Sequence, residues 1–286
     1  MRRPEDIKAR IGNIEQIEGV VVAMRAMAAA HAQEARKHLT AIREQERTVA
    51  RAMIDALSLL SGAAHHPTGE TQDGLHLQIV VGAAQGFSGS YSDRIISRAL
   101  GEMEGAEGAN GGASDAFLLV GQRCISEFEG RRIAPVWSAN MASHPGEVPQ
   151  LASQIVDAVF ALIDRSAFVR VSIIYGEPDK TDQSLTVRRL MPFDFSRFEK
   201  AARSNAPLIT LSPSVLVTHL VKEYVFTEIC EALMLGFAAE NDARMSAMSR
   251  ARTNVRQIRE DLRTQFAQAR QEQTTTEIIE LSNDDT

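Results

Sequence analysis

The chain has 286 residues, of which 44% are hydrophobic and 24% charged, and its formal net charge is −6. This length allows one large domain or two modest ones, and the acidic balance excludes a general electrostatic attraction to nucleic acid or anionic lipid. Two distant cysteines, Cys124 and Cys230, argue against a disulfide framework or a zinc site. The longest early apolar run, residues 20–24, is too short for a membrane span or a signal peptide, so we expect a soluble chain without an export signal.

The first predicted element is a long helix over residues 6–61. No proline occurs between Pro4 and Pro67, so nothing interrupts a helix there. Steps of seven residues along this segment meet only apolar side chains, which is the heptad pattern of a coiled coil. The column consists of Ile7, Ile14, Val21, Ala28, Ala35, Ile42, Val49 and Ala56. At 1.5 Å per residue, this helix would be roughly 80 Å long.

The middle of the chain, where most prolines and glycines gather, has the pattern of an α/β domain. Strands are predicted at residues 75–83, 116–121, 168–176 and 184–190. Helices are predicted near residues 92–103 and 150–164. This alternation predicts βαβ crossovers and a small, open, Rossmann-like sheet. The glycine-rich residues 101–116 predict a surface loop.

A glycine-rich turn, GAAQGFSGSYS, starts at Gly82 after the first predicted strand. Such a turn can bind phosphate at the start of the next helix. The spacing of Gly82, Gly86 and Gly89 does not fit GxGxxG, and no lysine follows as GxxxxGK[ST] requires, so a structural turn is favoured. His31 and His38 lie seven residues apart, not the three or four that one metal ion needs. We expect no cofactor, no metal and no catalytic site.

A second long helix is predicted over residues 215–281, roughly 100 Å long, because no proline follows Pro213. Its apolar seam, with steps of three and four, consists of Met248, Ala251, Val255, Ile258 and Leu262. The two ends therefore predict a long antiparallel coiled coil that projects from the central α/β domain. The predicted division is residues 1–62 for the N-terminal coiled-coil helix, 63–212 for the central domain and 213–286 for the C-terminal coiled-coil helix.

The C-terminal helix carries a run of arginines: Arg244, Arg250, Arg252, Arg256, Arg259, Arg263 and Arg270. Two interpretations remain open. The arginines could form a solvated face that pairs with Glu240, Glu260, Asp261 and Glu272, or they could form a surface for acidic loops of a partner, since guanidinium groups suit carboxylates geometrically.

The segment AAENDARMSAMSRARTNV, residues 238–255, carries a regular pattern at Glu240, Ala243, Arg244, Ala247, Met248, Ala251 and Asn254. This pattern resembles the C-terminal helix of the gamma subunit of F-type ATP synthases. The family's terminal Arg-Gln-x-x-Ile-Thr-x-Glu-Ile is matched at Arg270, Gln271, Thr275, Glu277 and Ile278. Near the N-terminus the matches are Ile7, Arg10, Ile11, Ala23, Met24 and residues 28–30, and in the glycine-rich turn they are Gly86, Gly89 and Tyr91.

The departures from the family pattern are those of a divergent member, such as the sodium- or proton-translocating alternative ATPases that some bacteria carry. The family's Lys-Ile-Thr-Lys is Gly-Val-Val-Val at residues 19–22, and the Ser-Asp-Arg before the turn's first glycine is Ala-Ala-Gln at residues 83–85.

The resemblance implies a non-catalytic rotor shaft that couples ion flow through a membrane c-ring to ATP synthesis or hydrolysis. The implied partners are the alpha and beta subunits, the epsilon subunit and the c-ring, at the cytoplasmic face of the bacterial inner membrane. Arg270 and Gln271 are implied to grip a beta-subunit loop. Further implied contacts are Met24, Arg244, Met248, Arg252, Arg256 and Arg259. The alternatives are a nucleotide-binding α/β protein with helical arms and a coiled-coil scaffold or nucleic-acid-binding rod.

Overall fold

The computed structural model describes residues 3–60, 75–109, 115–165, 168–178, 185–195 and 208–284. The chain divides into two compact units. The terminal unit consists of Met1–Ala29 and Arg244–Thr286, and the central unit consists of Ala30–Ala243. The long helices α1 (Pro4–Ser58) and α5 (Pro213–Asp284) each contribute one end to each unit.

The sheet of the central unit has five strands in the order β3-β2-β1-β4-β5. Its strands are β1 (Leu75–Val81), β2 (Asp115–Val120), β3 (Trp137–Ala139), β4 (Phe168–Gly176) and β5 (Leu185–Met191). Neighbouring strands are parallel, except that β5 runs antiparallel to β4. The four predicted strands are confirmed, and β3 was not predicted because three residues are too few to show a period.

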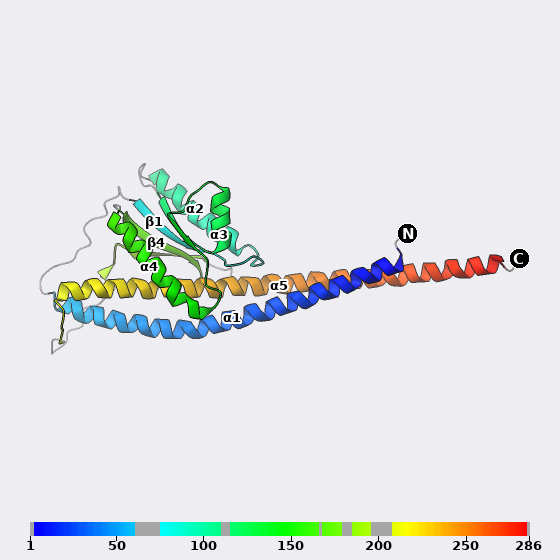
Figure 1. The fold of residues 1–286 in the computed structure, drawn as a ribbon, viewed down its shortest axis with the longest axis horizontal. Helices are drawn as coiled ribbons and strands as arrows, with labels where there is room; N and C mark the ends of the chain where they lie inside the picture. The colour runs from blue at the N-terminus through cyan, green and yellow to red at the C-terminus, as the bar shows by residue number, and fades with distance from the viewer. Residues whose placement is uncertain are drawn as a thin grey trace. The chain divides into compact units, whose positions relative to one another are not determined.

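Helices cover both faces of this sheet (Figure 1). One face carries α2 (Tyr91–Ala109) and α3 (Gln122–Gly130), which pack on Val80, Phe117 and Ile174. The other carries α4 (Val148–Arg165), which follows the short 3₁₀ helix η1 (Pro145–Glu147), together with α5. These helices pack on strand residues of alternate parity, as the period of two requires.

The predicted loop at residues 101–116 is wrong over most of its length. Helix α2 continues to Ala109 and β2 begins at Asp115, while residues 110–114 lie outside the described residues. Alanine, glutamate and methionine between the glycines are strong helix formers, and each glycine costs only about 1 kcal/mol of helix propensity. The composition therefore permits a helix up to Ala109.

The two long helices start at Pro4 and Pro213, where a missing N–H is harmless because first-turn amides have no intrahelical acceptor. The heptad column of α1 is covered as predicted: six of its eight members are buried, and Ile14 and Ile42 are half-buried. No helix of the described residues is both long and apolar enough to span a bilayer.

Within each unit the two helices run antiparallel. In the central unit, Arg36 contacts Asp242 and Arg43 contacts Glu231. A higher residue number on α1 thus pairs with a lower residue number on α5. In the terminal unit, Glu15 contacts Arg263 at 3.5 Å and Glu18 contacts Arg256 at 3.1 Å, which gives the same direction. The predicted fold class, an antiparallel coiled coil with an α/β domain, is confirmed.

Candidate functional site

The glycine-rich turn binds a carboxylate of the chain itself. The backbone amides of Ala84 and Gln85 donate to Glu240 Oε2 and Oε1, at 3.0 and 3.4 Å. Glu240 belongs to α5 and is only 1% exposed. Amides that could bind a phosphate at the end of β1 are therefore occupied by an internal anion. The turn itself requires left-handed backbone at Phe87 (φ 65°) and Gly89 (φ 60°).

Helix α5 also fills the crevice where sheets of this topology usually bind ligands. That crevice lies beyond the carboxyl ends of the strands where the strand order reverses, here between β1 and β4. The backbone oxygen of Gly236 accepts a hydrogen bond from Tyr91 Oη at 3.1 Å. A Cβ at Gly236 would lie 2.8 Å from Val81 Cγ1, and one at Gly176 would lie 2.6 Å from the ring of Tyr91. The helix is thus seated directly on the sheet.

Three polar side chains meet on the face of the sheet that α2 covers. His76 Nδ1 lies 3.1 Å from Asp115 Oδ1, and His76 Nε2 lies 2.8 Å from Ser172 Oγ. A carboxylate, a histidine and a serine in hydrogen-bonded sequence resemble the catalytic triad of a hydrolase. However, Ser172 is only 4% exposed and the Asp115 side chain 2%, so a substrate could not reach them. We interpret the cluster as a structural link between β2, β1 and β4. Sequence reasoning missed it because residues 96 positions apart in the chain leave no local signal.

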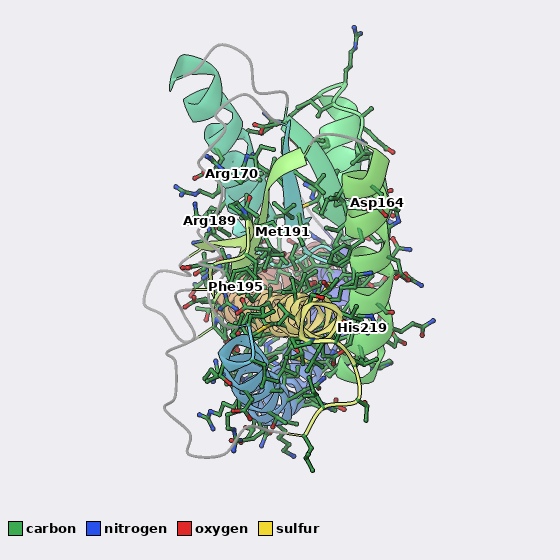
Figure 2. All side chains as sticks on the ribbon, turned by 90° about the vertical axis from the view of Figure 1, so that its left-hand side faces the viewer. Asp164, Arg170, Arg189, Met191, Phe195 and His219 are labelled. Atoms are coloured by element: carbon green, nitrogen blue, oxygen red, sulfur yellow. The ribbon has the colours of Figure 1, made fainter. Side chains whose placement is uncertain are left out.

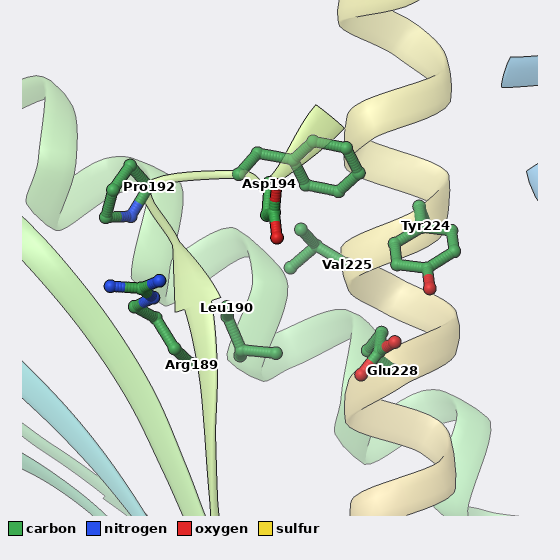
Figure 3. Close-up of a pocket in the computed structure, with 8 residues that line it drawn as sticks. Arg189, Leu190, Pro192, Asp194, Tyr224, Val225 and Glu228 are labelled. Atoms are coloured by element: carbon green, nitrogen blue, oxygen red, sulfur yellow. The ribbon is translucent and has the colours of Figure 1, made fainter. Parts of the chain in front are cut away.

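A cavity of about 190 Å³ lies between β5 and α5 (Figure 3). Its polar lining comes from Arg189, Asp194, Tyr224 and Glu228, and its apolar lining from Leu190, Pro192, Phe193 and Val225. Figure 2 shows Met191 at the sheet and Phe195 beside α5, so this segment leads the chain from sheet to helices. The cavity is smaller than the 300 Å³ or so at which ligand pockets start. Among the residues that the structure describes, no three potential ligands gather as a metal site would need.

In the terminal unit, three of the predicted contact arginines converge on one carboxylate. Glu18 of α1 accepts hydrogen bonds from Arg256 and Arg259, and Arg252 Nε lies 4.0 Å away. The hydrogen bond from Arg256 and the nearby guanidinium charges lower the pKa of Glu18, although partial burial opposes the shift. A second carboxylate lies near this cluster, since Glu260 Oε1 is 3.9 Å from Arg259 Nε.

This pairing corrects the interpretation of a face that pairs along its own helix. Glu260 does contact Arg263, at 3.2 Å. However, Glu240 binds the glycine-rich turn, and the principal carboxylate of the arginine cluster is Glu18, from the other helix. Spacing along one helix could not reveal a partner 238 positions away in sequence.

The other predicted contact residues differ in exposure. Met248 is 5% exposed and lies in the seam between the helices, so its side chain is covered within the chain. Met24 and Arg244 are half-buried. Arg270 and Gln271 are exposed, and their backbone oxygens accept hydrogen bonds from the hydroxyls of Thr274 and Thr275 at 2.9 Å.

Helix α1 of the terminal unit also presents apolar side chains to the outside. Ile17 is 48% exposed, Val20 58% and Met27 60%. Steps of three and seven place these residues, with Met24 between them, along one stripe of the helix. Exposed apolar side chains that gather in this way are typical of protein–protein contact surfaces.

Comparison with known proteins identifies close architectural relatives. A family model described as ATP synthase matches residues 3–283. The ATP synthase gamma chain of Salinibacter ruber is 27% identical over 99% of this chain and 97% of the relative, and that of Persephonella marina is 26% identical over 98% and 96%.

Solved structures share the fold. The rotor of the Euglena gracilis mitochondrial ATP synthase has a TM-score of 0.62 at 13% identity, covering 95% of this chain and 98% of that one. The central stalk/c-ring structure of the Tetrahymena thermophila mitochondrial ATP synthase has a TM-score of 0.59 at 18% identity, covering 81% and 99%.

Proposed function

Because the chain belongs to the family of ATP synthase gamma chains, we propose that it is the central shaft of a rotary ATP synthase or ATPase and breaks no bond itself. Its partners are a ring of alpha and beta subunits, an epsilon subunit and a membrane c-ring that carries protons or sodium ions. It works as a peripheral subunit at the cytoplasmic face of the bacterial inner membrane.

A shaft acts by offering different faces to equivalent catalytic subunits as it turns. Each face favours open or closed subunits only by the difference between its contacts with the two states. The terminal unit has such an asymmetry, because it carries an apolar stripe at Ile17, Val20 and Met27 and a cationic cluster around Glu18. The exposed apolar stripe is the observation that carries the proposal, since a pair of helices alone cannot cover it.

A non-catalytic role is supported by what occupies the crevice of the α/β domain. The amides of the glycine-rich turn bind Glu240, and α5 is seated where a nucleotide would lie. Arg270 and Gln271 are the proposed grip on a beta-subunit loop, because their side chains project from α5 without a described partner in the chain. Arg252, Arg256 and Arg259 are further proposed contacts for acidic loops of a partner, because guanidinium groups suit carboxylates geometrically.

The double substitution Arg270→Ala and Gln271→Ala tests this proposal in the assembled complex. We expect coupled ATP hydrolysis to fall about tenfold, which corresponds to one lost hydrogen bond to a charged group of about 1.5 kcal/mol. Folding should be unaffected, because neither side chain is buried. Gln268→Ala with Gln273→Ala is the matched control on the same exposed segment. Unchanged turnover of the Arg270/Gln271 variant in a fully assembled complex would contradict the proposed grip.

A further inference from the structure

The sheet holds α5 by a buried ion-pair network at the edge formed by β5. Arg188 Nη1 of β5 donates to Glu228 Oε2 at 2.7 Å and to Glu231 Oε2 at 2.8 Å. The two glutamate side chains are 3% and 11% exposed. Glu231 Oε1 also accepts from Arg43 Nε of α1 at 3.0 Å, so the network links β5, α5 and α1.

A second polar anchor holds α5 from the glycine-rich turn. Both oxygens of Glu240 accept backbone amides, those of Ala84 and Gln85. These amides lie in the turn that follows β1, so this anchor reaches the sheet at a different strand from the first.

The two anchors lie on opposite sides of α5. Glu231 and Glu240 are nine residues apart, which is about two and a half turns of an α-helix, so their side chains leave the helix roughly 180° apart. Ile229, Leu233 and Gly236, which face the sheet, leave the helix within about 40° of Glu240, whereas Glu231 leaves it on the side away from them. Apolar packing on that face is not directional and tolerates small rotations, whereas the two anchors depend on direction and distance.

Both anchors contain buried carboxyl groups of α5, since Glu228 is 3% exposed and Glu240 1%. Burial disfavours the charged form of Glu231, but hydrogen bonds from Arg188 and Arg43 keep its pKa below the ordinary value. Removing either partner of such a pair leaves a buried charge without compensation, which is strongly unfavourable.

We infer that the Arg188 network and the Glu240 anchor form a two-sided clamp that keeps α5 from turning about its own axis against the sheet. The inference rests on the proposed function, in which torque must pass between the α/β domain and α5. Rotation in either sense moves Glu231 and Glu240 sideways in opposite directions and stretches both anchors, so the clamp stiffens the shaft in torsion. The covalent connections of the chain prevent free rotation of α5 even without the clamp. We therefore expect the clamp to matter most when the motor works against a load and the torque on α5 is greatest.

The test compares variants in the reconstituted, membrane-embedded complex. Arg188→Met removes the first anchor, and Glu240→Gln weakens the second while preserving its shape. Arg36→Met is the matched control, because it breaks a 2.7 Å ion pair with Asp242 that joins α1 to α5. The measured quantity is the number of ions pumped per ATP hydrolysed against an established ion gradient.

We expect this ratio to fall at least threefold in the double variant, to fall less in each single variant and to stay unchanged in the control. A structural role alone would lower pumping and hydrolysis in parallel with the amount of assembled complex and leave the ratio unchanged, which would overturn the clamp. Should the double variant fail to assemble, the single variants decide: a lowered ratio in either supports the clamp, and an unchanged ratio in both overturns it.

If the proposed function is wrong, the result is different. Even the wild-type chain would then restore no ion pumping to a complex from which the shaft subunit is missing. In that case the isolated chain decides on the clamp. Spin labels at Ser126→Cys in α3 and His219→Cys in α5 occupy exposed sites, and the native cysteines are buried. The distance distribution between the labels should broaden in the double variant, and an unchanged width would overturn the clamp.

Discussion

Replacing Gly236 by alanine tests how closely α5 is seated on the sheet. Alanine gains roughly 1 kcal/mol of helix propensity over glycine. The new methyl group would lie 2.8 Å from Val81 Cγ1, however, closer than real Cβ atoms approach. Val81 is fully buried in β1 and valine is stiff about χ1, so the strand or the helix must move. Overpacking of this kind costs roughly 1–3 kcal/mol, and with this stiff neighbour we expect a net loss of about 1–2 kcal/mol.

Gly101→Ala is the matched control. Gly101 lies in the exposed part of α2, and a Cβ there would meet nothing within 4 Å, so this variant should gain up to about 1 kcal/mol. Urea unfolding followed by the fluorescence of Trp137, the single tryptophan, reports on the central unit in both variants. A Gly236→Ala protein as stable as Gly101→Ala would refute the close contact between α5 and β1.

Two further predictions concern charge and burial. Because the folded-state pKa of Glu18 is lowered from its ordinary 4.5, its stabilisation is present above that pH and is lost as pH falls through the lower folded value. Acid titration of helicity should therefore show a smaller loss below about pH 4.5 in Glu18→Gln than in the wild type, and identical curves would contradict the pairing. Burial raises the pKa of the Cys124 and Cys230 thiols to about 12, and a thiolate is the reactive form. A thiol reagent at pH 8 should label neither cysteine until denaturant is added, whereas rapid labelling of the folded chain would contradict their burial.

Features with a sequence period were predictable. The heptad column of α1, from Ile7 to Ala56, follows from the repeat of the helix, and every member is buried or half-buried. Strands such as Phe168–Gly176 are long enough to show their apolar pattern. The three-residue strand β3 (Trp137–Ala139) and the nine-residue helix α3 (Gln122–Gly130) are too short for this.

Features that depend on contacts across the chain were not predictable. Glu240 matches a family motif, but nothing near it indicates that its partners are amides 155 and 156 positions away. The partners of Glu18 and Arg188 were likewise not predictable, because each of these residues pairs with a side chain on another element, α5. The family pattern in the sequence does single out Arg270 and Gln271, which the structure shows exposed on a long helix, and their contact with a partner stays a prediction.

Direct observation of rotation is the sharpest test of the shaft assignment. The chain would be assembled with the alpha and beta subunits of the same organism, the ring would be fixed to a surface, and a probe would be attached to the α/β domain at Ser126→Cys. The account predicts that the probe turns in one direction when ATP is added and stops when ATP is removed. Steady ATP hydrolysis by complexes that contain the chain while the probe stays still would contradict it.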